Sequence, residues 1–170
     1  MIVQTRDSMK AALVALLVGS LALAVAGCPA KPGAQTMDPP IVDRVDMDDY
    51  LWKNRPVLVF GPADSDIRYR RQMQEFDGKG TELQDRDIVL LALPRDGRRS
   101  LDGQALAASG SESLWQRFEV ATDGFAVILV GKDGGAKLRS QEPVAAARIF
   151  DLIDSMPMRQ AEMRRKAASN

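Results

Sequence analysis

One thiol nucleophile is available in this chain, because Cys28 is its only cysteine. The sequence contains no histidine. Serine–histidine–aspartate triads, cysteine–histidine pairs and zinc sites that need histidine are therefore excluded. A lone cysteine also excludes CxxC redox chemistry and zinc sites made of cysteines alone. Any catalysis would rest on carboxylate, lysine, serine, threonine or tyrosine side chains.

Cys28 ends an apolar stretch near the start of the chain. Residues 11–26 carry no charge and follow the basic residues Arg6 and Lys10. A helix of this stretch is about 24 Å long. That length is short of the ~30 Å hydrocarbon core of a bilayer. The pattern therefore predicts an export signal peptide over residues 1–27.

The residues "VAGC" that close this stretch resemble the lipobox of bacterial lipoproteins, in which the cysteine becomes the lipidated first residue. The resemblance implies lipidation of Cys28, and two or more acyl chains anchor a protein stably. One alternative is ordinary cleavage after Ala26, at a small–x–small pattern, which leaves a free thiol near the new N-terminus. A buried structural cysteine is the other alternative.

A proline-rich segment over residues 28–40 begins with the cysteine and contains four prolines. This composition favours extended backbone and cannot form a core, so the segment is predicted to be a tether. Residues 41–170 have a size suited to one domain. Together these features predict a lipid-anchored protein on the extracytoplasmic side of the cell membrane. In a double-membraned bacterium the expected location is the outer membrane, facing the periplasm.

Charge and phosphate-binding motifs narrow the expected partners. The chain has 23 Lys and Arg against 23 Asp and Glu, which gives no electrostatic basis for nucleic-acid binding. It contains neither a Walker-type phosphate loop nor a GxGxxG motif, and no cofactor is predicted. The expected partners are the membrane, through the lipid anchor, and an unidentified protein or cell-wall component.

A methionine-rich segment near the C-terminus is a candidate metal site. Met156, Met158 and Met163 carry soft thioether groups, which suit Cu(I). The alternative is structural. Pro157 disfavours helix at the residue before it and suits the first turn of a terminal helix. The expected caps of that helix are Asp154 or Ser155, and its expected packing residues are Met158, Ala161 or Met163.

Charged side chains in the hairpin and the terminal helix form a candidate recognition surface. They are Asp133, Lys137, Arg139, Asp154, Arg159 and Glu162. The alternatives are an ion-pair network that joins the two elements, and solvent-exposed pairs worth only ~0–1 kcal/mol each. Asp64 and Asp66 form a carboxylate pair suited to acid–base hydrolysis, but no motif places them.

Three apolar runs predict the strands that position these residues. They span residues 56–60, 87–94 and 125–131. Unbroken runs rich in Val, Ile and Leu are typical of strands buried on both faces. After the third run, Asp133 and Gly134 suit the tight turn of a hairpin. The returning strand is expected over residues 136–140.

Helices are predicted between and after these strands. In the first helix, Asp66 caps the start and Gly78 marks the end. Its apolar face carries Tyr69, Met73 and Phe76. The second helix carries Leu114, Trp115 and Phe118. A third opens at Pro143, and its buried stripe is Ala146, Ile149, Phe150 and Ile153. The order β-α-β-α-β-β-α predicts a three-layer α/β/α domain with a mixed sheet.

This order, with "RPVLVF" in the first strand and "FAVILVGKDGGAKLR" in the last two, resembles the thioredoxin-like superfamily over residues 52–153. In redox-active members a cysteine follows the first core strand, whereas residues 61–71 here contain none. A cis-proline normally precedes the third core strand, whereas residues 121–125 contain no proline. The resemblance therefore implies a thioredoxin-like fold without thiol oxidoreductase activity.

Three blocks, "LWKNRPVLVF", "GFAVILVGKDGGAKLRS" and "LIDSMPMRQAEM", resemble an uncharacterised family of bacterial envelope proteins. A related domain occurs in animal extracellular proteins of the equarin and sushi-repeat type. The resemblance implies a thioredoxin-like domain that works by binding. Two function hypotheses follow. The first is an interaction module presented on a membrane tether. The second is an enzyme or metal carrier without cysteine chemistry, at residues 61–71 or at the methionine-rich segment.

Overall fold

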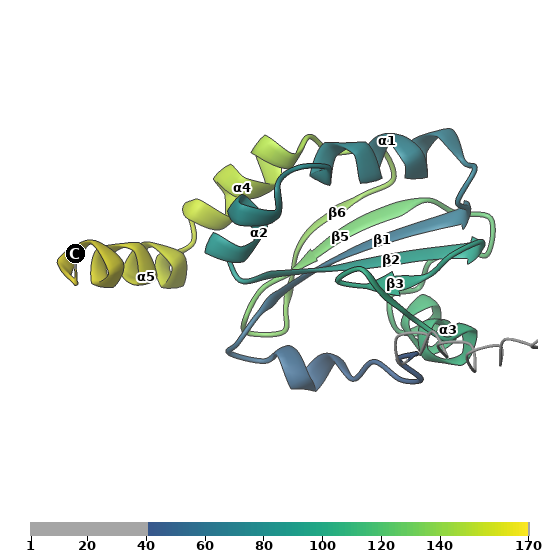
Figure 1. The fold of residues 1–170 in the computed structure, drawn as a ribbon, viewed down its shortest axis with the longest axis horizontal. Helices are drawn as coiled ribbons and strands as arrows, with labels where there is room; N and C mark the ends of the chain where they lie inside the picture. The colour runs from purple at the N-terminus through teal and green to yellow at the C-terminus, as the bar shows by residue number, and fades with distance from the viewer. Residues whose placement is uncertain (1–40, 170) are drawn as a thin grey trace, which may run out of the picture. The chain divides into compact units, whose positions relative to one another are not determined.

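The structure is a computed structural model that describes residues 41–169. The expected signal peptide, Cys28 and the tether lie outside these residues. The described part forms a mixed six-stranded sheet with helices on both faces (Figure 1). The predicted α/β fold with a mixed sheet in its middle layer is thereby confirmed. No helix in this part of the chain is long and apolar enough to cross a membrane.

The central strand of the sheet is β1 (Arg55–Ala63). It lies parallel to β2 (Ile88–Asp96) and antiparallel to β5 (Ala126–Val130). Strands pair on both sides of β1 and helices cover both faces, so its residues are buried without interruption from Arg55 to Gly61. This position explains the unbroken apolar runs. The three predicted strands are confirmed, with ends that differ by a few residues.

The strands at the two edges of the sheet are shorter than β1 and β2. β6 (Ala136–Ser140) forms one edge and follows β5 through a turn in which the Gly134 N–H donates to the Gly131 carbonyl at 2.9 Å. Gly134 has a φ of +78°, so it supplies the left-handed conformation of the predicted hairpin turn. The other edge is a hairpin of β3 (Ser100–Leu101) and β4 (Gln104–Ala105). Two-residue strands leave no periodic signal, and this hairpin was not predicted.

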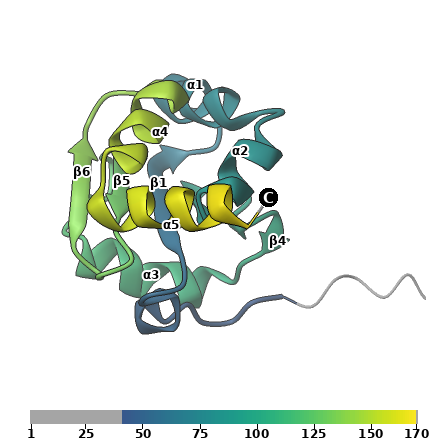
Figure 2. The same cartoon turned by 90° about the vertical axis from the view of Figure 1, so that its left-hand side faces the viewer.

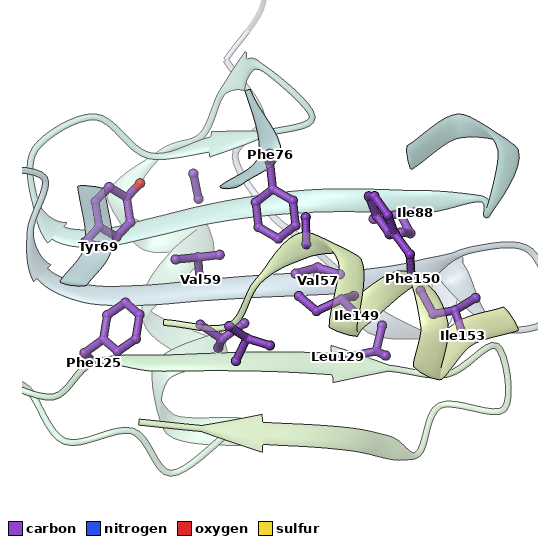
Figure 3. Packing of buried hydrophobic residues seen from close by; sticks show 14 residues of the cluster. Val57, Val59, Tyr69, Phe76, Ile88, Phe125, Leu129, Ile149, Phe150 and Ile153 are labelled. Carbon is purple, nitrogen blue, oxygen red and sulfur yellow. The ribbon is translucent and has the colours of Figure 1, made fainter. Parts of the chain in front are cut away.

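One face of the sheet is covered by α1 (Ile67–Phe76), α2 (Gly80–Asp85) and α4 (Ala146–Asp154). Figure 3 shows apolar side chains of α1 and α4 packed over those of β1, β2 and β5, and Leu83 of α2 packs against the same cluster. The predicted stripe of α4 is buried as expected. The cap of α1 is also confirmed, because the Asp66 carboxylate accepts the N–H groups of Arg68 and Tyr69.

α4 begins later than predicted. The prediction placed its start at Pro143, but the first helical residue is Ala146. Side chains of α1 hold the preceding backbone outside the helix. The Gln72 side chain accepts the Val144 N–H at 2.7 Å and donates to the Val144 carbonyl at 3.0 Å. The Glu75 carboxylate accepts the Ala146 N–H at 3.0 Å. A tertiary contact therefore sets the helix boundary.

The other face is covered by α3 (Ala108–Arg117) and a short 3-10 helix, η1 (Met47–Tyr50). The predicted apolar residues of α3 pack here, and the Trp115 ring meets Phe60 edge-on at 5.1 Å between ring centroids. Phe118 lies just past the helix and is partly buried. The sequence patterns did not predict η1 or α2, since each is a single short turn of helix without an apolar period.

The last helix is α5 (Pro157–Ala168), which follows α4 after a sharp corner at Ser155 and Met156. The predicted corner and terminal helix are confirmed, but the expected cap is wrong. Met156 is the N-cap, and no side chain caps the helix. Asp154 is engaged by arginines instead, and the Ser155 hydroxyl donates to the Leu152 carbonyl.

The expected packing of α5 on the sheet through Met158, Ala161 or Met163 is also wrong. Arg159 is the buried residue of this helix, and Met158 is 38% exposed. Figure 2 shows α5 in front of the end of the sheet where β1 begins. The helix is held there by ionic contacts with strand ends, so it needs no apolar stripe.

Candidate functional site

The three sequence blocks meet at one end of the sheet (Figure 2). Arg55 begins β1 there, the β5–β6 turn lies beside it, and Pro157 begins α5 at the same end. We call this region the Arg55 end. The opposite region, residues 61–68, where β1 passes into α1, is the Asp66 end.

A groove of about 340 Å³ lies at the Arg55 end. Its lining residues are Arg55, Gly131, Lys132, Asp133, Lys137, Met156, Pro157 and Met158. Every one of them belongs to one of the three blocks that carry the family resemblance. The lining joins cationic side chains to an apolar surface of two methionines and a proline, which is typical of ligand sites with a few fixed polar groups.

A second hollow, of about 420 Å³, lies between residues 43–46 and α3. Its lining residues lie outside the three blocks. Its charged side chains, two aspartates and two arginines, are balanced. The groove at the Arg55 end is therefore the better candidate site.

A connected ion-pair network lies beside the groove. Its cations are Arg55, Arg86, Lys132, Arg159 and Lys166. Its carboxylates are Asp85, Asp87, Asp154 and Glu162. The network joins α5 to the strand ends and to the β5–β6 turn. These contacts explain why a helix with one buried residue stays docked.

Arg55 and Glu162 form the most buried pair of the network. The Arg55 side chain is only 1% exposed, and its Nη2 donates to both carboxylate oxygens of Glu162 at 3.0 and 3.1 Å. Its Nη1 donates to the Arg86 carbonyl at 2.9 Å. Lys132 reaches the same Glu162 carboxylate at 2.9 Å and Asp87 at 2.7 Å. One carboxylate of α5 therefore ties β1 to the β5–β6 turn.

Arg159 makes the second anchor of α5. It donates to the Asp85 carboxylate and to the Asp85 carbonyl, and its Nε donates to Asp154 at 3.1 Å. Arg86 donates to the same Asp154 carboxylate at 2.6 Å, and Arg86 also lies over the Phe150 ring at 4.7 Å from the centroid. This anchor joins α5 to the ends of α2 and α4.

The network lowers the pKa of two carboxylates, Asp85 and Glu162. Hydrogen bonds from Lys166 and Arg159 hold the pKa of Asp85 below its ordinary value. Burial acts to raise the pKa of Glu162, but hydrogen bonds from Lys132 and Arg55 outweigh it and lower that pKa. Both carboxylates are therefore held ionised in the folded protein.

Trp52 is joined to the groove through its backbone. Its side chain is 67% exposed, and its backbone N–H donates to the carbonyl of Lys132, a lining residue, at 2.7 Å. Its φ of +62° is in the left-handed region, where a bulky residue costs about 1 kcal/mol or more. The fold thus holds a large aromatic side chain in solvent next to the groove, at a conformational cost.

The structure separates the six charged residues of the predicted recognition surface into three places. Asp133 and Lys137 pair with each other at 2.6 Å at the groove, and that hydrogen bond lowers the pKa of Asp133. Arg139 donates instead to the carbonyls of Phe118 and Glu119. The other three are in the ion-pair network. They are Asp154, Arg159 and Glu162.

The predicted thioether set is also divided. Met156 and Met158 line the groove, whereas Met163 is not among its lining residues. Within residues 41–169, no group of three or more histidine, cysteine, aspartate or glutamate side chains is placed to hold a metal ion.

Sequence patterns missed six members of the network. They are Arg55, Asp85, Arg86, Asp87, Lys132 and Lys166. Arg55 precedes a buried strand and Asp87 opens another, so both were assigned to strands and not to a site. Glu162, the partner of Arg55, lies 107 positions away from it, and charged residues carry no pattern that connects such distant positions.

The Asp66 end is the place where redox-active relatives of this fold carry their cysteine. Its polar contacts are local: the Asp66 carboxylate caps α1 and pairs with Arg68 at 3.2 Å. Burial, with a smaller effect of the Asp64 charge, raises the pKa of Tyr69 to about 12. No peptide bond in residues 41–169 is cis. The predicted carboxylates Asp64 and Asp66 share no hydrogen bond among the contacts of this region.

Comparison with known proteins assigns the family. A family model described as "Domain of unknown function (DUF4174)" matches residues 46–162. The chain belongs to this family. The matched residues include the whole groove and every member of the ion-pair network except Lys166. The DUF4174 domain therefore contains the candidate site.

Two curated relatives share this domain at low identity. The chain is 28% identical over 130 residues to coiled-coil domain-containing protein 80 of Danio rerio, which covers 67% of this chain and 15% of that protein. It is 27% identical over 112 residues to sushi repeat-containing protein SRPX2 of Xenopus laevis, which covers 64% of this chain and 24% of that protein. The chain thus spans less than a quarter of the length of either relative.

Solved structures identify the fold. Prx1a of Plasmodium yoelii superposes with a TM-score of 0.51 at 16% identity, over 69% of this chain and 81% of that chain. The reduced 2-Cys peroxiredoxin of Plasmodium vivax gives 0.51 at 14% identity, over 69% and 85%. At such identities the likeness concerns the fold alone. The predicted thioredoxin-like fold of the DUF4174 domain is confirmed.

Proposed function

We propose that this DUF4174 protein is a membrane-anchored binding module without thiol redox chemistry, and that the groove at the Arg55 end is its binding site. One observation carries the proposal: all eight residues that line the groove come from the three blocks on which the family resemblance rests, and all eight lie within the matched residues 46–162. These blocks are far apart in the sequence, and folding brings them to one surface.

The composition of the two ends supports binding over thiol catalysis. Residues 61–71 include no cysteine, and the chain has no histidine to activate a nucleophile. The groove instead has charged side chains already held by partners, next to methionines that adapt to apolar ligands. Such a site is suited to recognition.

Site-specific photocrosslinking tests the binding surface. A benzophenone amino acid is placed at Trp52, beside the groove, or at Ile67, at the Asp66 end. These residues form a matched pair, because both are large, apolar and exposed, at 67% and 63%. In the native host, position 52 should give a discrete crosslinked product and position 67 should not. Equal crosslinking at both positions, or none at position 52, would contradict the proposal.

The anchoring part of the proposal concerns the N-terminal residues. We propose that Cys28 is lipidated after export and that residues 28–40 form the tether. The domain would then face the extracytoplasmic side of the membrane. Mass spectrometry of the mature N-terminus should find a diacylated or triacylated cysteine, and Cys28→Ser should release the protein from the membrane fraction. A mature chain that begins at Gly27 without acyl groups would refute this part.

A further inference from the structure

The ion-pair network beside the groove carries an excess positive charge. It contains five cations and four carboxylates, which leaves a net charge of +1. The remaining charged lining residues, Asp133 and Lys137, neutralise each other. Lys166, the fifth cation, is 68% exposed, so water solvates part of this charge. The charged side chains of the groove lining are three cations, Arg55, Lys132 and Lys137, and one carboxylate, Asp133. This majority of cations in the lining favours a monoanionic ligand.

Arg55 adds an unsatisfied donor to this site. Its side chain is 1% exposed and lines the groove, yet its Nε has no hydrogen-bond partner. A buried donor without a partner costs ~1–3 kcal/mol. The Nε atoms of Arg86, Arg95 and Arg99 also lack a partner, and Arg55 differs from them because it lines the groove. An acceptor brought by a ligand, with a small shift of the guanidinium, would provide the missing partner of Arg55.

The first turn of α5 contributes a second positive element. Met156 is its N-cap without a side-chain cap, and Pro157 occupies the first position. Both line the groove. The first N–H groups of a helix have no partner inside the helix, and its N-terminus carries about half a positive charge. A carboxylate bound there would take the place of the missing cap.

The apolar part of the lining limits which anion fits. Met156, Pro157 and Met158 supply the apolar lining, and the exposed Trp52 is bonded through its backbone N–H to the lining residue Lys132. An inorganic anion would leave this surface uncovered. The ligand that matches both halves of the groove therefore carries a carboxylate and an apolar group close together.

We propose that the groove binds the C-terminal residue of a partner peptide, with its free carboxylate toward Arg55 and the α5 N-terminus. The apolar side chain of that residue covers Met156 and Met158. A terminal residue is the smallest peptide unit that carries a carboxylate and a side chain on the same carbon. That compactness suits a groove of about 340 Å³, near the lower limit of ligand sites. The inference rests on the proposed function and specifies its ligand.

Methyl NMR of methionine tests this inference on the purified full chain in detergent micelles. The probe is N-acetyl-Gly-Ala-Leu with a free carboxylate, compared with the same peptide amidated at its C-terminus. The free acid should shift the methyl signals of Met156 and Met158. Met47 and Met73, which pack in the two cores, should stay unchanged. Loss of the carboxylate should weaken binding about tenfold or more.

A pair of charge-removing variants completes the test. Lys137→Gln removes a cation that lines the groove, and Arg71→Gln removes an exposed cation of α1. The first should weaken binding of the free acid several-fold, and the second should leave it unchanged. A third peptide, N-acetyl-Asp-Ala-Leu-amide, carries its carboxylate away from the terminus and should bind as weakly as the amide.

Three results would overturn the inference: equal binding of acid and amide, equal binding of the internal carboxylate, or no shift at Met156 and Met158. Crosslinking at Trp52 separates these failures from failure of the proposed function. A product at position 52 together with any of them would retain the binding module and reject the terminal carboxylate as its ligand.

Discussion

The two ends of β1 differ in how their polar residues are satisfied. At the Asp66 end, the carboxylate of Asp66 caps its own helix and pairs with Arg68, two residues away. At the Arg55 end, Arg55 and Lys132 share a carboxylate of α5 that is distant in sequence from both. The first end is held by local contacts, whereas the second exists only when distant elements meet.

The proposed binding site lies opposite the usual ligand position in this type of fold. In open α/β sheets, ligands generally bind beyond the carboxyl ends of the parallel strands, which here is the Asp66 end. That end has kept its helix cap and lacks a thiol. The amino ends of β1 and β2 hold the buried charges and the groove. A fold-level analogy would direct attention to the Asp66 end, whereas our proposal directs it to the Arg55 end.

Of the changes that test this comparison, Arg55→Leu should cause the largest loss in the free energy of unfolding. Removing one partner of a buried ion pair typically costs ~3–5 kcal/mol, because the other charge stays buried without compensation. The free energy of unfolding should fall by that amount in urea denaturation. Arg55→Lys keeps the charge but not the forked geometry, so its loss should be smaller. A loss below ~1 kcal/mol for Arg55→Leu would show that the network does not hold the Arg55 end together.

Acidification should cause the second-largest loss of stability, because it protonates carboxylates at the Arg55 end. The folded-state pKa values of Glu162 and Asp85 are lowered, so their contribution to stability is present above the unfolded-state pKa values and is lost as the pH falls through the folded ones. The ordinary values are 4.5 and 3.8, so the loss should occur below that range. Urea denaturation at pH 6 and at lower pH measures it. Glu162→Gln should flatten the dependence, and parallel curves for variant and wild type would contradict this.

Asp66→Ala, at the Asp66 end, should cause a smaller loss of stability. It removes the carboxylate that accepts the N–H groups of Arg68 and Tyr69 at 2.9 and 3.2 Å. Loss of such a cap typically costs ~1 kcal/mol. Asp66→Asn can still cap, so it should retain most of the stability. A loss for Asp66→Ala as large as that for Arg55→Leu would erase the proposed difference between the two ends.

Lys137→Gln should have the smallest effect on stability. Lys137 and Asp133 are a partly exposed pair, with side chains 33% and 45% exposed, and such pairs contribute ~0–1 kcal/mol. The free energy of unfolding of the variant, measured in urea, should match that of the wild type within ~0.5 kcal/mol. Preserved stability would make any loss of peptide binding attributable to the groove. A larger loss would assign Lys137 to the structural network.

The elements that sequence patterns predicted well are those with local causes. The strands around Val57 and Ile128, the cap at Asp66 and the turn at Gly134 each follow from a short run of residues. The errors occur where a contact between residues distant in sequence sets a helix boundary or the docking of a helix. The backbone before Ala146 is held by α1 and not by Pro143, and α5 is docked by ions and not by its methionines.

The sequence alone determined the order of the long strands and helices, the mixed sheet, and the lack of histidine and of a second cysteine. These properties follow from hydrophobic periodicity and composition, which are readable along a short stretch of chain. The tertiary structure alone decided which charges meet, that Arg55 is buried, and that three separate blocks line one groove. Ion-pair partners leave no periodic trace in a sequence, because packing of the strands and helices between them sets their distance.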